Sequence, residues 1–228
     1  MEELLAEYKA DRQKNEKTEK QAERWVEMPE ITKVLHQKYK DLREDNIMGK
    51  ETLTKSEFKK LQSFVIASLY MLDPENHPPV RLDYNMKVIS KRDYDKLSEK
   101  ELKENYLVVQ SRTKKFFSFG QYKTDKKFGL KVIPVSKTIN SLLNVWLKHN
   151  KSEYLLLNTR GGRMNPDGLS KAVRAFFRKE MGKELGVSML RSIYLSHKFP
   201  ADEIDERKRV GDAMLHSIGT QAEYVKRD

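Results

Sequence analysis

The sequence predicts a mainly α-helical fold with a small antiparallel β-sheet. Apolar residues recur at helical spacing along most of the chain. One stretch, 116–136, differs, because aromatic and β-branched runs lie on either side of a polar turn, a pattern typical of a β-hairpin. The apolar share of 38% in 228 residues is enough for one core. This length suits one large domain, or one domain with an appendage.

The first half of the chain predicts two core helices after an exposed one. Residues 1–24 alternate acidic and basic side chains without glycine or proline, which favours an exposed helix outside the core. Apolar residues near helical spacing predict helices over 28–44 and 55–72, the second more buried. Pro74 and the pair Pro78–Pro79 are expected to end that helix.

The second half holds the hairpin and then returns to helix. Within 116–136, a turn with lysines and Asp125 separates the two strand-like runs, the second of which ends in Ile-Pro. Apolar patterns then predict helices over 138–150, 167–184 and 188–199, and a short one over 210–216.

The charge of the chain favours a polyanionic partner. Lys and Arg total 45 against 34 Asp and Glu, which gives a formal charge of +11 and a pI near 9.5. Residues 112–137 hold eight of these basic residues and a single acid, Asp125. A basic hairpin of this kind suits a phosphate backbone. The alternative is a solvated lysine-rich edge that protects an exposed strand.

Several classes of protein are excluded by composition. The chain has no cysteine, which rules out disulfides, thiolate metal sites and cysteine nucleophiles. There is no run of about 18 apolar residues that could span a bilayer, and the N-terminus lacks the apolar segment of a signal peptide. We therefore expect no membrane partner and an intracellular protein of the cytoplasm or nucleus, or a virus-encoded one.

Four short motifs carry the chemistry. PPVRLDY contains Arg81, GQYKTDKKFG contains Lys123, VSMLRSIYLSHKF contains Arg191, and MLHSIGTQAEY contains His216 and Tyr224. In this order the motifs resemble the catalytic domain of tyrosine recombinases, the integrase family that shares its site with type IB topoisomerases. LRSIYLSH is similar to the family's arginine helix, MLHS to its Leu-Gly-His-Ser, and YKTDKKFGLKVIPV to its lysine hairpin.

The resemblance implies a function and a domain division. Residues 25–228 would form the catalytic domain, and 1–24 a linker helix or the tail of a missing N-terminal DNA-clamping domain. The implied activity is site-specific recombination or integration, in which DNA strands are cleaved and rejoined through a 3′-phosphotyrosine without metal or nucleotide cofactor. The implied partner is double-stranded DNA, with four protomers on paired sites in the full-length protein.

The resemblance also assigns a role to each residue. Tyr224 would attack the phosphodiester, and its ordinary pKa of about 10 means that it needs help to ionise. Arg81 and Arg191 would hold the non-bridging oxygens, because forked guanidinium groups can grip two oxygens at once. His216 would also contact the phosphate. Lys123, on the hairpin, would protonate the leaving 5′-oxygen.

Three departures from the family pattern bear on this assignment. Ser188 stands where the family often has a histidine, three residues before Arg191, and a serine carries no charge. The interval between His216 and Tyr224 is one residue shorter than is common, and few residues follow the tyrosine. We therefore expect altered catalysis, with Ser188 and His197 as possible accessory residues.

Other basic residues are expected to contact DNA, and other assignments are open. Lys126 or Lys127 could replace Lys123, and Arg81 could be a helix-end cation. Two alternative functions are relaxation of DNA in the manner of a type IB topoisomerase, and DNA binding with weak catalysis. The predicted DNA-binding residues are Lys114, Lys115, Lys126, Lys127, Lys131, Arg160, Arg163, Lys171 and Arg174.

Overall fold

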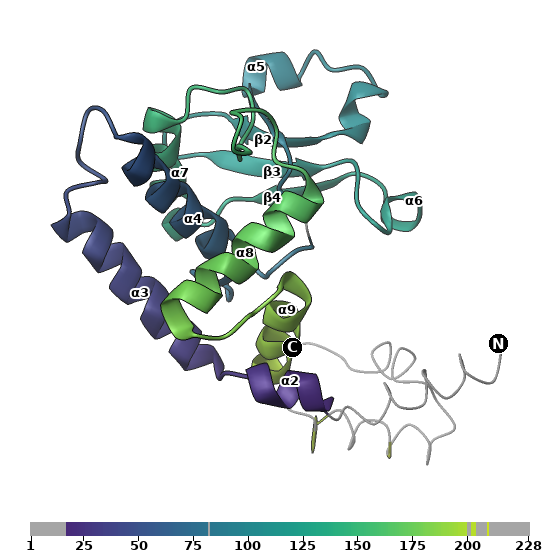
Figure 1. Cartoon of the computed structure of the whole chain (residues 1–228). Coiled ribbons are helices and arrows are strands. Elements are labelled where there is room, and N and C mark those ends of the chain that lie inside the picture. The colour runs from purple at the N-terminus through teal and green to yellow at the C-terminus, as the bar shows by residue number, and fades with distance from the viewer. Residues whose placement is uncertain (1–16, 82, 200–201, 204–208, 210–228) are drawn as a thin grey trace, which may run out of the picture.

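The fold is mixed α/β, with helices predominating and one four-stranded sheet (Figure 1). The computed structural model describes residues 17–81, 83–199, 202, 203 and 209. Its elements are α2 (Glu19–Arg24), α3 (Met28–Glu44), α4 (Lys55–Met71), β1 (Lys87–Ser90), α5 (Lys91–Tyr94), the 3-10 helix η1 (Glu101–Lys103), β2 (Asn105–Val109), β3 (Lys115–Phe119), α6 (Asp125–Phe128), β4 (Lys131–Pro134), α7 (Lys137–His149), α8 (Pro166–Met181) and α9 (Val187–Lys198).

The helices predicted within 28–199 are present, and side-chain caps mark where α4, α7 and α8 begin. Thr54 and Glu57 form a reciprocal capping box at the start of α4. Asn165 caps α8, whose first residue is a proline. Gly182 ends α8 with a φ of 67°, a left-handed conformation that favours glycine. The predicted helix over 210–216 lies outside the described residues.

The sheet is mixed, which corrects the prediction of an antiparallel one. The strands lie in the order β1-β2-β3-β4. The pairs β2–β3 and β3–β4 are antiparallel, with Asn105 opposite Phe119 and Phe119 opposite Lys131, so the predicted hairpin is present. β1, however, runs parallel to β2, because the chain passes through α5 and η1 before it returns to the sheet.

Helix α4 lies at the centre of the core. It packs against α3, α7, α8 and α9, and its second half is buried on nearly every side. In Figure 1, α4 and α8 lie between the sheet and the pair formed by α2 and α9. No described helix is long and apolar enough to cross a membrane.

Candidate active site

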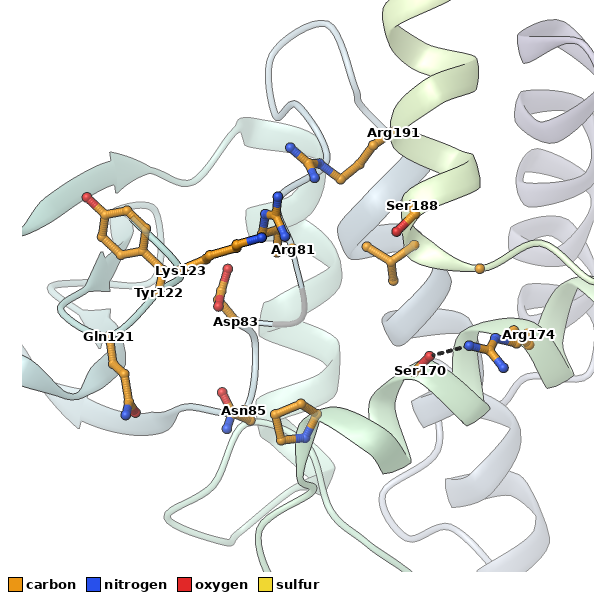
Figure 2. Close-up of a pocket in the computed structure, with 13 residues that line it drawn as sticks. Arg81, Asp83, Asn85, Gln121, Tyr122, Lys123, Ser170, Arg174, Ser188 and Arg191 are labelled. Carbon is orange, nitrogen blue, oxygen red and sulfur yellow. Dashed lines mark hydrogen bonds between the residues drawn. The ribbon is translucent and has the colours of Figure 1, made fainter. Parts of the chain in front are cut away.

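A polar pocket of about 720 Å³ lies where the loop after α4, the β3–β4 connection, α8 and α9 meet (Figure 2). Three of the predicted catalytic residues, Arg81, Lys123 and Arg191, line this pocket. Ser188, the predicted accessory residue, lines it as well. The other lining residues are Asp83, Asn85, Gln121, Tyr122, Pro166, Ser170, Arg174, Gly186 and Val187.

Positive charge dominates the pocket. Among the described residues, its lining has four basic side chains, with Arg174 as the fourth, and one acidic side chain, Asp83. Burial raises the pKa of the Asp83 carboxyl, while the charges of Arg81 and Arg191 oppose this shift. Burial lowers the pKa of Arg191, and the nearby Arg81 lowers it further. The two guanidinium groups thus repel each other with partial compensation from one carboxylate, an arrangement that favours a bound anion.

Arg81 lies on a loop whose backbone is held at three carbonyl groups. We call residues 78–81 and 83–86 the arginine loop. The Tyr70 hydroxyl of α4 donates to the Arg81 carbonyl at 3.0 Å. The Asn105 side chain donates to the Asp83 carbonyl at 3.1 Å, and Arg163 Nε donates to that of Asn85 at 2.7 Å. Because each donor comes from a different part of the fold, the loop is fixed against all three parts.

A buried hydrogen-bond chain supports the arginine loop from beneath. His77 Nε2 lies 2.6 Å from the Tyr84 hydroxyl, which donates to the Leu69 carbonyl at 3.0 Å. The single hydroxyl hydrogen of Tyr84 is used in that second bond, so His77 donates through Nε2. Burial lowers the pKa of His77 to about 4, although Asp73 opposes the shift.

The His77 environment predicts a pH dependence of stability. The unfolded chain binds a proton near the ordinary pKa of 6.5, whereas the folded chain resists protonation down to about 4. The contribution of neutral His77 to the free energy of unfolding should therefore be complete above pH 6.5. This free energy should fall by about 3 kcal/mol as the pH drops to 4. Urea unfolding at several pH values measures this. In His77→Gln, which keeps a donor for Tyr84, the decrease should be smaller; an equal decrease would contradict the assignment.

Lys123 lies on the connection from β3 to β4, which we call the lysine loop (residues 120–130). The Tyr122 hydroxyl donates to the Gly129 carbonyl at 2.6 Å and closes the loop on itself around α6. Lys123 is exposed and lines the pocket. Lys126 instead lines a separate hollow beside Gly120, which favours Lys123 over Lys126 for the predicted role.

Arg191 comes from the first half of α9. Leu190 and Ile193 are buried and anchor this helix to the core. Ser188 and Arg191 are three residues apart, so they lie on the same helix face, and both reach the pocket. His197 is exposed and lines a different groove, against α3, so the structure does not bring it to Arg191. His216 and Tyr224 lie outside the described residues.

The predicted DNA-binding residues fall into three groups. Most are exposed: Lys114, Lys126, Lys127, Lys131, Arg160, Lys171 and Arg174. Arg174 lines the pocket and donates to Ser170 Oγ at 3.1 Å (Figure 2). Arg163 is half-buried, and its Nε holds the arginine loop.

The prediction that Lys115 contacts DNA needs correction. Lys115 is 5% exposed, and its ammonium group donates to the side-chain oxygens of Asn140 at 2.9 Å and Asn144 at 2.6 Å, and to the Arg112 carbonyl at 3.1 Å. These bonds tie the β2–β3 turn to α7. Burial lowers the pKa of Lys115, because the charged ammonium group is removed from water.

Asp83, Tyr70 and Asn105 were not singled out from the sequence, although they shape the site. Within the described part of the chain, no three His, Asp or Glu side chains gather as metal ligands would. The arrangement can hold an anion with several oxygens between forked cations and place an ammonium group beside it. In comparisons with known proteins, no family model, no curated protein and no solved structure matches this chain.

Proposed function

We propose that the chain is a DNA strand-cleaving and rejoining enzyme of the tyrosine recombinase type. One observation carries the proposal: Arg81, Lys123 and Arg191, distant in sequence, line one pocket. The motif order that singled out these residues took no account of their positions in space. Their convergence is what a site for one phosphodiester requires, since two forked cations and one proton donor must reach the same phosphate.

The chemistry follows from the charges. The two arginines hold the non-bridging oxygens, where negative charge increases in the transition state. The Tyr224 oxygen forms a bond to phosphorus and gives up its proton to water, while the bond from phosphorus to the 5′-oxygen breaks. Lys123 supplies the proton that the leaving oxygen takes up. The phosphotyrosine conserves the energy of the broken bond, so a second 5′-hydroxyl can reseal the strand without a nucleotide cofactor.

Double-stranded DNA is the proposed partner. The net charge of +11 favours a polyanion. Lys123 lines the pocket, and Lys126, Lys127 and Lys131, which follow it in the sequence, are exposed. Binding through such contacts weakens as salt rises, because each phosphate contact releases a counterion. Exchange of strands between two duplexes would involve four protomers on paired sites.

Covalent trapping tests the proposal. The protein is mixed with nicked, partly randomised duplexes, quenched in detergent and run on a denaturing gel. A DNA–protein band is expected for the wild type, and none for Tyr224→Phe, which removes the nucleophile but should keep salt-sensitive binding. A band that persists in Tyr224→Phe would contradict the assignment. Binding without any band would favour a DNA-binding module, and relaxation of plasmid without paired sites would favour topoisomerase-like activity.

A further inference from the structure

The side chain of Asn105 joins the two loops that carry Arg81 and Lys123. Asn105 begins β2 and is 2% exposed. Its Nδ2 donates to the Asp83 carbonyl of the arginine loop at 3.1 Å and to the Gln121 carbonyl of the lysine loop at 2.8 Å. Its Oδ1 accepts from the Gln121 backbone N–H at 2.9 Å. One planar amide group therefore links the backbones of both loops.

The bonding partners require an asparagine at this position. The Gln121 N–H is a donor and must face the side-chain oxygen, while two carbonyl oxygens must face the side-chain nitrogen. An ionised aspartate would set a charged oxygen against two carbonyl oxygens, and an aliphatic side chain would leave buried polar groups without partners. All three bonds are made to backbone atoms, so they fix the course of the loops rather than one side chain.

A close backbone contact at Gly120 also restricts the position of the lysine loop. The Gly120 N–H donates to the Glu104 carbonyl at 3.2 Å, directly beside Asn105. A Cβ atom on Gly120 would come within 1.9 Å of the Leu102 carbonyl oxygen, so the lysine loop begins in direct backbone contact with the chain that precedes β2. The lysine loop therefore leaves the sheet in one direction, set by residues 102–105.

We propose that Asn105 is a positioning residue that sets the spacing between the guanidinium group of Arg81 and the ammonium group of Lys123. The inference rests on the proposed function, in which these two groups act on one phosphate. When Asn105 is replaced, the arginine loop keeps its bond to Tyr70, and the lysine loop keeps the backbone bond from Gly120 to Glu104. What is lost is the link between them. Proton delivery by Lys123 should suffer most, because proton transfer requires hydrogen-bond distance.

Asn150 provides a matched control. It is 4% exposed, its Nδ2 donates to the Tyr154 carbonyl at 2.9 Å and the Leu155 carbonyl at 3.1 Å, and its Oδ1 accepts from the Ser152 N–H at 3.1 Å. The bonds thus match those of Asn105 in kind and number, but they lie after α7 and outside the pocket. Asn105→Ala and Asn150→Ala should lose similar stability. A difference between their trapping rates would therefore come from the place of Asn105 between the two loops, and not from lost stability.

The experiment compares covalent trapping rates of these two variants with the wild type and Lys123→Ala. On ordinary duplex, the covalent trapping rate of Asn105→Ala should be about 10²-fold lower than that of the wild type, at unchanged DNA affinity. The rate of Asn150→Ala should equal that of the wild type. A second duplex has sulfur in place of the bridging 5′-oxygen, and its thiolate leaves without a proton. On that duplex, Asn105→Ala and Lys123→Ala should both recover most of the lost rate. Equal rates for the two asparagine variants, or no recovery with sulfur, would overturn the inference.

A distance measurement tests the link without catalysis. The chain has no cysteine, so spin labels can be attached to cysteines introduced at Pro78 in the arginine loop and Lys127 in the lysine loop, both exposed. The distribution of label distances should broaden in Asn105→Ala and remain unchanged in Asn150→Ala. An unchanged distribution in Asn105→Ala overturns the inference even if no strand cleavage is observed, whereas absence of a wild-type DNA adduct tells against the proposed function alone. Asn105→Ser and Asn150→Ser replace the alanine variants if Asn105→Ala does not fold.

Discussion

Arg191→Ala is expected to lower the rate of covalent DNA attachment by about 10²- to 10³-fold, the effect of removing one donor to a developing oxyanion. The guanidinium group of Arg191 is half-buried beside Arg81 and Asp83, where charges interact more strongly than in water. Its loss leaves Asp83 compensated by Arg81 and weakens the field that attracts a phosphate. DNA affinity should fall far less, because the exposed lysines remain. Gel shifts alongside covalent trapping separate the two effects.

The matched control for this prediction is Arg178→Ala. Arg178 is exposed on α8, forms an ion pair with Glu184 and does not line the pocket. The substitution removes the same charge from the protein, so it should weaken DNA binding slightly and leave the rate of attachment within about twofold, as expected for an exposed ion pair. A loss of rate in Arg178→Ala equal to that in Arg191→Ala would mean that net charge, not the pocket, determines the rate.

Gly120→Ala is expected to destabilise the protein by about 3 kcal/mol, at the upper end of the usual cost of overpacking. The added methyl group would lie 1.9 Å from the Leu102 carbonyl oxygen and 2.7 Å from that of Glu104. Both are backbone atoms, so no side chain can rotate away, and the strands or the lysine loop must shift. Urea unfolding gives the change in stability from the midpoint at constant slope.

Gly162→Ala isolates this steric effect. The nearest atom to a Cβ on Gly162 is Asn158 Nδ2 at 3.3 Å, the end of a side chain on an exposed loop, and neither glycine has a positive φ. The control should change stability by about 0.5 kcal/mol or less. If the two variants unfold at the same urea concentration, the chain before β2 does not hold the lysine loop in the way described.

The long helices α3, α4, α7, α8 and α9 could be predicted because their signals are local. Apolar periodicity and caps such as Thr54 and Asn165 lie within the segments that they define. The parallel pairing of β1 could not be predicted, because it depends on a partner that lies beyond α5 and η1. The burial of Lys115 could not be predicted for a similar reason, since its acceptors Asn140 and Asn144 lie on α7, far along the chain.

The residues of the site also differ in whether the sequence could predict them. Arg81, Lys123 and Arg191 stand in motifs whose order carries information, and the structure places them around one pocket. Asp83 and Asn105 belong to no periodic pattern, and a single asparagine at the start of a strand has no signature of its own. Their roles depend on contacts between segments far apart in the chain, which a single sequence does not display.

The pocket draws its lining from the loop after α4, the lysine loop, α8 and α9, so its residues come from segments far apart in the chain, from Arg81 to Arg191. Contacts between distant segments form late in folding, because the intervening chain must first lose its freedom. A nascent or partly folded chain therefore holds its cations apart. If the proposed chemistry is correct, the power to break DNA emerges only with the completed fold, so incomplete molecules can bind DNA through their charge without cutting it.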